Sequence, residues 1–266
     1  MGPRSAHSGL HLRIWAAEAA GTALMVLAVV LAAGLTLGES SPVAQALPGP
    51  GARFLALGAI IGPCIALITV SPLGRLSGAH INPALTLGFW VLGRVSGHDL
   101  AGYLGAQLAG GLAGALVAAA LLPTAVADSI GGGVTHPTVS TTTAVAIEAA
   151  MTAILLLVVL GFLSRPRLAR WTPLVLAPLL TVLVWLGSPP TGASLNPARS
   201  EGPALAFADT ADLWIYLLGP LAGALAAALL WRTGLCGAGP VTAKLFHDPR
   251  YQCSLRSELP AMPCNA

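Results

Sequence analysis

Two stretches of this sequence are near copies: Ser-Gly-Ala-His-Ile-Asn-Pro-Ala-Leu-Thr-Leu-Gly at 77–88, and Thr-Gly-Ala-Ser-Leu-Asn-Pro-Ala-Arg-Ser-Glu-Gly at 191–202. Asparagine is a favoured N-cap, and proline is favoured as the first residue of a helix because its missing N–H has no partner there. Each phrase therefore predicts that a short helix begins at its Asn-Pro pair. Asn82 and Asn196 are the predicted N-caps.

The rest of the chain is strongly apolar. Of 266 residues, 55% are hydrophobic and 9% charged, whereas about 25% of an ordinary soluble domain is charged. This composition predicts an integral membrane protein of the all-α class, and the net charge of +3 requires no nucleic-acid partner. A helix needs ~20 residues to cross the ~30 Å hydrocarbon core. Six apolar windows are long enough, at 12–34, 52–71, 99–122, 142–163, 172–188 and 212–232.

The short helices that open with Pro83 and Pro197 should have a different depth. About ten residues at ~1.5 Å each give roughly half the thickness of the hydrocarbon core. Their non-helical lead-ins can exist at that depth only where protein or a water-filled cavity satisfies the backbone. A lone Asn-Pro pair usually marks an ordinary turn, but two pairs at matching places predict two re-entrant half-helices and a lumen.

The duplication extends beyond the two phrases. Glu18-Ala-Ala-Gly-Thr-Ala opens the first window and Glu148-Ala-Ala-Met-Thr-Ala opens the fourth. Each half has three spans, an odd number, so the second half must enter the membrane from the opposite side. This arrangement is an inverted repeat, in which the binding site is expected near the midplane. We predict one channel domain at 12–233, with repeat one at about 12–122, repeat two at about 142–233, and tails at 1–11 and 234–266.

The basic residues predict the orientation. If the N-terminus is cytoplasmic, eleven Lys and Arg residues lie inside and only Arg53 and Arg199 outside. This bias predicts a multi-pass protein of the plasma or inner membrane with both termini in the cytoplasm. Three cysteines in the second tail, with His247, fit no zinc spacing, so we expect a disordered tail and no metal or cofactor. These cysteines are Cys236, Cys253 and Cys264.

The paired Asn-Pro-Ala boxes, the two matched glutamates and the six windows resemble the aquaporins, the major intrinsic protein family. The likeness covers roughly residues 12 to 232. It implies a right-handed bundle of six helices with two half-helices, four such chains in one homotetramer, and a passive pore. A secondary transporter is the alternative from another class, because transporters also use inverted repeats and broken helices. No nucleophile, metal set or phosphate loop suggests an enzyme.

Several roles follow for the pore. Two half-helix N-termini at one midplane spot repel cations and protons, and the amides of Asn82 and Asn196 should donate hydrogen bonds to a passing oxygen. Glu18 and Glu148 should accept hydrogen bonds from the re-entrant loops, although a transporter would use them as proton relays. We expect His80 to brace or line its loop instead of binding a metal. The expected loop-lining residues are Gly78, Ala79, His80, Gly192 and Ser194.

Arg199 of the second phrase is charged, whereas the equivalent residue of the first phrase, Leu85, is apolar. Arg199 should form the outer constriction, and the alternative is a structural ion pair with Glu201. In strict water channels of this family, a phenylalanine and a histidine accompany the arginine. Counting from the boxes puts those places at Ile61 or Gly62, and at Val184, with Ala193 in the loop. Missing aromatic bulk predicts a wide pore for water, small polyols, urea or uncharged metalloid hydroxides. A strict water channel stays open as an alternative, because Ser200 is the water-channel choice, whereas Leu217 favours the wider pore.

Overall fold

The structure is a computed structural model that describes residues 8–251 and 255–259. Its regular elements are all helical in these residues, which confirms the all-α prediction, and six helices are long and apolar enough to cross a membrane. The six are α1 (Ser8–Leu37), α3 (Gly49–Val70), α6 (Gly97–Leu121), α8 (Thr141–Leu163), α10 (Thr172–Thr191) and α12 (Leu213–Arg232). The shorter elements are α2 (Pro42–Ala46), α4 (Pro72–Ser77), α5 (Pro83–Val91), α7 (Thr124–Ser129), η1 (Gly131–Gly133), α9 (Pro166–Ala169) and α11 (Pro197–Ala206).

Both short helices begin at the prolines of the repeated phrase. They are α5, with nine residues, and α11, with ten. The helix before the second phrase is longer than its apolar window, because α10 continues through Pro189 and Pro190 to Thr191. It ends at Gly192, whose left-handed backbone (φ 79°) suits a helix C-cap.

The two repeats interlock. Within each repeat the first long helix packs on the third, so α1 contacts α6 and α8 contacts α12, while the equivalent helices α3 and α10 pack on each other. Each half-helix crosses to the other repeat, because α5 packs on α12 and α11 packs on α6. This exchange surrounds a single centre with elements from both halves, as an inverted repeat requires.

Glycines allow the first and third helices of each repeat to touch backbone to backbone. A Cβ atom on Gly110 would lie 2.2 Å from the carbonyl oxygen of Ala19, and one on Gly223 would lie 2.0 Å from that of Ala149. Only a hydrogen atom fits there, which is how small residues let helices approach in lipid. Ala19 and Ala149 directly follow the two matched glutamates, so these contacts fix the depth and rotation of both carboxylates.

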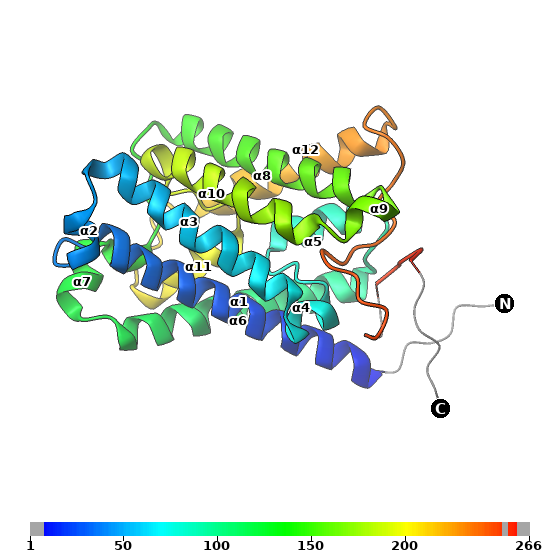
Figure 1. Cartoon of the computed structure of the whole chain (residues 1–266), viewed down its shortest axis with the longest axis horizontal. Helices are drawn as coiled ribbons and strands as arrows, with labels where there is room; N and C mark the ends of the chain where they lie inside the picture. Colours follow the sequence, from blue (N-terminus) through cyan, green and yellow to red (C-terminus); the bar gives the residue numbers. More distant parts are fainter. Residues whose placement is uncertain (1–7, 252–254, 260–266) are drawn as a thin grey trace.

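The bundle has two distinct ends (Figure 1). We call the end at which α1 begins and α12 finishes the tail end; α4 and α9 also lie there, whereas α2 and α7 lie at the opposite, far end. By their elements, most basic residues of the described chain fall at the tail end. They are Arg13, Arg75, Arg94, Arg165, Arg167, Arg170, Arg232, Lys244, Arg250 and Arg256.

The C-terminal tail corrects one expectation. Its composition suggested disorder, and the described part does lack regular helix beyond α12, but it is packed onto the tail end of the bundle. Lys244 is 0% exposed and Leu245 is 2% exposed. An irregular segment can be buried when other elements satisfy its backbone, which local composition does not reveal. Cys236 is a free thiol, and Cys253 and Cys264 lie outside the described residues.

Candidate functional site

The asparagines of the repeated phrase cap the two half-helices. Oδ1 of Asn82 accepts a hydrogen bond from the N–H of Ala84 at 2.9 Å, and Oδ1 of Asn196 accepts one from Ala198 at 3.0 Å. Both asparagines have extended backbones, and a proline follows each as the first helical residue. Local sequence therefore suffices to start each helix at its Asn-Pro pair.

The same two side chains also tie the repeats to each other. Nδ2 of Asn82 donates to the carbonyl oxygen of Leu195 at 2.9 Å, and Nδ2 of Asn196 donates to that of Ile81 at 2.8 Å. Sequence reasoning missed this reciprocal pair, although the matching positions of the two boxes were a signal for it. A carboxamide carries two N–H donors, and Nδ2 of Asn196 also lies 3.9 Å from Sδ of Met25, a weak acceptor on the cavity wall.

The lead-ins to both half-helices have an unusual backbone. Ala79 and Ile81 have φ angles of 56° and 40°, and their equivalents Ala193 and Leu195 have 48° and 54°. Non-glycine residues in this left-handed region cost about 1–3 kcal/mol each and persist only where the surroundings fix them. The two loops therefore need strong anchors.

Glu18 supplies the anchor in the first repeat. Its Oε1 accepts from the N–H of His80 at 3.1 Å, and its Oε2 accepts from the N–H of Ile81 at 2.7 Å. Nε2 of Gln107 donates to Oε2 as well, at 2.8 Å. The carboxylate is completely buried, and all three of these contacts are donors to it.

Glu148 makes the equivalent contacts in the second repeat. Its Oε1 accepts from the N–H of Ser194 at 3.0 Å, and its Oε2 accepts from that of Leu195 at 2.7 Å. The hydroxyl of Thr191 donates to Oε1 at 2.7 Å. In both repeats, each carboxylate thus binds the left-handed residue just before the asparagine and the residue preceding it.

Arg199 lies on the first turn of α11, with its side chain buried beside the cavity. Its Nη1 donates to the carbonyl oxygen of Gly133 at 2.9 Å. In the described part of the chain it forms no ion pair with Glu201, whose Oε2 is buried without a hydrogen-bond partner. Sequence reasoning missed Gly133, although a run of three glycines, Gly131 to Gly133, was a signal for an unusual backbone; all three have positive φ.

A cavity of about 70 Å³ lies beside the two re-entrant loops. Ile61 lines it from α3, whereas Gly62 faces α10, where a Cβ would lie 2.2 Å from the carbonyl oxygen of Ala177. Gly62 is therefore the wrong one of the two alternatives. Gly78 is also absent from the wall, because it lies under Lys244 of the tail. The other expected lining residues do line the cavity: Ala79, His80, Asn82, Val184, Gly192, Ala193, Ser194, Asn196 and Arg199.

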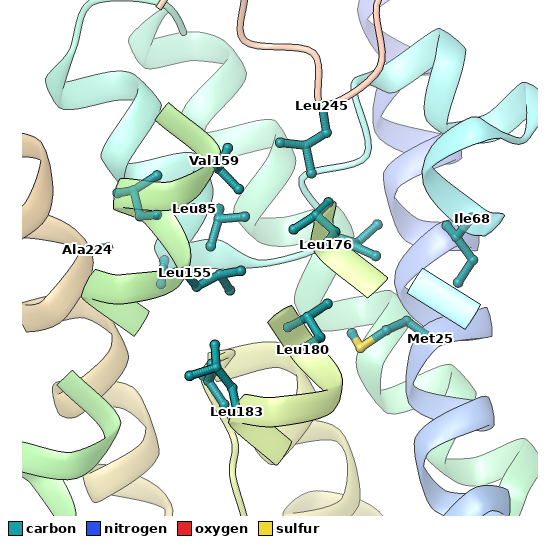
Figure 2. Close-up of a cluster of buried hydrophobic side chains, with 14 of the residues drawn as sticks. Met25, Ile68, Leu85, Leu155, Val159, Leu176, Leu180, Leu183, Ala224 and Leu245 are labelled. Carbon is teal, nitrogen blue, oxygen red and sulfur yellow. The ribbon is translucent and has the colours of Figure 1, made fainter. Parts of the chain in front are cut away.

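The remaining wall is almost entirely aliphatic. Figure 2 shows the side chain of Met25 extending from α1 toward Leu180 of α10. The apolar lining residues that sequence reasoning did not name are Met25, Val29, Leu57, Ile65, Ile81, Leu85, Leu155, Leu176, Leu180, Leu195 and Leu245. A few convergent polar groups on an apolar wall give a passing molecule few hydrogen-bonding partners, so their position decides what can pass.

His80 is held on all sides. Its Nδ1 lies 3.2 Å from Oγ1 of Thr86, its Nε2 lies 2.8 Å from the carbonyl oxygen of Ala243, and its ring stacks on Phe89 with 4.8 Å between centroids. Both ring nitrogens are therefore engaged with oxygen atoms of the protein.

Comparisons with known proteins agree with this geometry. The chain matches the family described as Major intrinsic protein over residues 5–231. It is 40% identical over 172 residues to the Lens fiber major intrinsic protein of Gallus gallus, which covers 63% of this chain and 64% of that protein. It is 35% identical over 208 residues to Aquaporin Z of Brucella melitensis biotype 1, covering 74% and 90%. The X-ray structure of the aquaglyceroporin from Plasmodium falciparum shares the fold, with a TM-score of 0.68, 21% identity, and coverage of 85% and 97%.

Proposed function

The chain is a multi-pass member of the major intrinsic protein family of membrane channels, and on this premise we propose that it is a passive pore for water together with small uncharged solutes. Glycerol, urea and uncharged metalloid hydroxides are the solute classes. The observation that carries this proposal is the aliphatic lining of the cavity that Arg199 also lines, to which Ile61 and Val184 contribute.

Ion exclusion is the first part of the proposed mechanism. The N-termini of α5 and α11 meet beside the cavity, and each carries about half a positive elementary charge. Arg199 adds a full charge on the same wall. These charges oppose cations and protons, whereas a neutral solute does not meet that barrier. The amide groups of Asn82 and Asn196, which line the cavity, would donate to a passing water oxygen and interrupt a proton wire.

Pore width is the second part. The side chains of Ile61, Val184 and Ala193, all aliphatic, line the cavity. Strict water channels of this family have a phenylalanine at the place of Ile61 and a histidine at the place of Val184. Ser200, which favours the strict water channel, is bonded to the hydroxyls of Thr135 and Ser194 at 2.8 and 2.7 Å and does not line the cavity. Its influence on the width of the constriction is therefore indirect. The small aliphatic side chains that line the cavity favour passage of small polyols.

The buried glutamates favour a channel over a coupled transporter. Each carboxylate is surrounded by two backbone N–H groups and a side-chain donor, as described above. A proton relay needs a group that can release those contacts during transport, whereas a fixed brace must keep them. We therefore assign Glu18 and Glu148 to loop support.

The proposal is tested with purified protein in lipid vesicles, by stopped-flow permeability to water, glycerol, urea and arsenious acid. We expect permeability to water and to at least one of the three solutes above that of empty vesicles, without counterflow or coupling to a proton gradient. Vesicles that gain water permeability but stay as tight as empty ones to all three solutes would identify a strict water channel. Proton-coupled uptake would identify a transporter.

A narrower filter should change the choice of solute. Ile61→Phe is expected to lower glycerol permeability by about tenfold or more, which corresponds to ~1.4 kcal/mol, while water permeability falls much less. Ile60→Phe is the matched control, because Ile60 is 37% exposed on the adjacent face of α3 and does not line the cavity. Equal glycerol permeability in the Ile61→Phe variant and the parent would remove Ile61 from the constriction.

We further propose that the tail end faces the cytoplasm and that four chains assemble in a cell membrane. The basic residues at the tail end support this orientation, because cytoplasmic loops carry an excess of Lys and Arg. An epitope added after Ala266 should be inaccessible to antibody in intact cells. Accessibility of the epitope from outside would contradict the proposed orientation. Chemical crosslinking in the membrane should give species of up to four chains.

A further inference from the structure

The segment of residues 241–248, here called the tail segment, crosses the tail end of the pore. Figure 1 shows the orange chain after α12 returning over the end of the bundle that carries α4, α5 and α9. The family match ends at residue 231, so this segment lies outside the matched residues. Five of its residues are nearly or completely buried: Thr242, Ala243, Lys244, Leu245 and Asp248.

The tail segment hydrogen-bonds to the re-entrant loop itself. The N–H of Leu245 donates to the carbonyl oxygen of Gly78 at 3.0 Å, and the carbonyl oxygen of Ala243 lies 2.8 Å from Nε2 of His80. Since His80 lines the cavity, these contacts hold the segment at the pore and not merely on the bundle surface. The N–H of Val241 adds a bond to the carbonyl oxygen of Leu163 at 2.8 Å.

Leu245 enters the pore. Its side chain lines the same cavity as Arg199 and both asparagines, and it belongs to the buried cluster that includes Leu176. Figure 2 shows Leu245 pointing down from the tail toward the side of the cluster that includes Leu176. A leucine side chain offers no hydrogen bond to water, and a hydrophobic constriction of this kind closes a pore by dewetting.

Arg75 anchors the segment from α4. Its carbonyl oxygen accepts from Nζ of Lys244 at 2.7 Å, its Nη1 pairs with Asp248 at 3.1 Å, and its guanidinium lies 5.5 Å from the ring centroid of Phe246. Hydrogen bonding from Arg250 lowers the pKa of Asp248 to about 2. A depressed carboxyl pKa keeps the ion pair formed above that pH, so this anchor persists throughout the physiological range and is lost only in strong acid.

Residues 256–258 of the tail make a second, outer set of contacts, with Arg94 and Val241. The N–H of Arg256 donates to the carbonyl oxygen of Arg94 at 3.1 Å, and the N–H of Glu258 donates to that of Val241 at 2.7 Å. Arg94 and Glu258 form an ion pair at 2.6 Å, in which the Glu258 side chain is 62% exposed. Exposed ion pairs are weak and screened by salt, so this ion pair adds little to the stability of the outer contact.

We propose that the tail segment is an autoinhibitory plug: it closes the tail-end mouth of the pore with Leu245 as the obstructing side chain, and the pore conducts when the segment lifts away. This inference rests on the proposed channel function. It predicts that the full chain conducts slowly by itself, and that loss of Leu245 or of the whole segment increases flux.

The test compares four proteins in vesicles by stopped-flow water permeability per reconstituted chain: the parent, Leu245→Ala, a truncation after Gly239, and Leu235→Ala. Leu235 is the matched control, because it belongs to the same tail but its side chain is 83% exposed. We expect Leu245→Ala and the truncation to exceed the parent by about fivefold or more, with Leu235→Ala unchanged. Equal and high permeability of all four would overturn the plug and leave the channel function intact. Folded proteins that all fail to conduct would overturn the channel function.

Amide hydrogen exchange of the full chain provides a second readout that needs no truncated protein. If the tail segment is docked, the peptide that contains Val241 to Leu245 should exchange slowly in the parent, and faster in Leu245→Ala. The peptide around Leu235 should exchange rapidly in both. Exchange of the tail segment at the rate of a free peptide in the parent would show that no plug is in place.

Discussion

Replacing Glu148 with alanine is expected to lower the yield of the protein. We also expect its free energy of unfolding to fall by about 3 kcal/mol or more. The carboxylate accepts hydrogen bonds from the N–H groups of Ser194 and Leu195 and from the hydroxyl of Thr191. A buried donor left without a partner costs about 1–3 kcal/mol, and here the two backbone N–H groups of a strained loop would be left, whereas the hydroxyl of Thr191 keeps the carbonyl oxygen of Gly187 as an acceptor at 3.2 Å. Thermal unfolding in detergent, followed by tryptophan fluorescence, measures the loss directly.

The conservative variant Glu148→Gln separates support from proton transfer. A glutamine presents one oxygen and one NH₂ group to a site whose contacts are all donors, so its NH₂ group must face a donor. We expect Glu148→Gln to be destabilised as well, although less than the alanine variant. Glu201→Gln is the matched control, because Oε2 of Glu201 has no hydrogen-bond partner. A Glu148→Gln variant as stable as the parent that lost only proton-coupled uptake would favour a transporter.

The features that sequence reasoning found are those determined by residues close together in the sequence. An asparagine cap followed by proline favours a helix start through contacts within its own first turn, and α5 and α11 begin as predicted. Matched phrases revealed the inverted repeat, and the apolar windows revealed the six long helices. Each of these signals needs only a few consecutive residues or a comparison of the two halves.

The features that it missed depend on contacts between distant residues. A one-residue uncertainty in counting left Ile61 and Gly62 as alternatives, and one residue along a helix turns the side chain by about 100°, which is why Ile61 lines the pore while Gly62 faces α10. The partner of Arg199 is a backbone carbonyl of Gly133, 66 positions away. Every residue has a backbone carbonyl, so the residue types do not show which carbonyl will accept a hydrogen bond. The position of Leu245 was missed for the same reason, because the tail segment is held by backbone hydrogen bonds.

The largest change in selectivity is expected from Arg199→Val. The substitution removes the one full charge from the pore wall but leaves the N-termini of α5 and α11 in place, so the fold and the midplane part of the barrier should remain. We expect proton and cation leakage through reconstituted vesicles to rise by about tenfold or more, a change of ~1.4 kcal/mol in the barrier. Water permeability should stay close to that of the parent.

Arg53→Val controls for the loss of an arginine at the far end of the bundle. Arg53 lies near the start of α3 and does not line the cavity, so its replacement should leave proton leakage unchanged. A pH-sensitive dye inside the vesicles measures that leakage in both variants under the same gradient. Leakage that is unchanged in a well-expressed Arg199→Val protein would mean that the half-helix N-termini alone exclude protons, since they are the only other positive ends directed at the midplane in the described part of the chain.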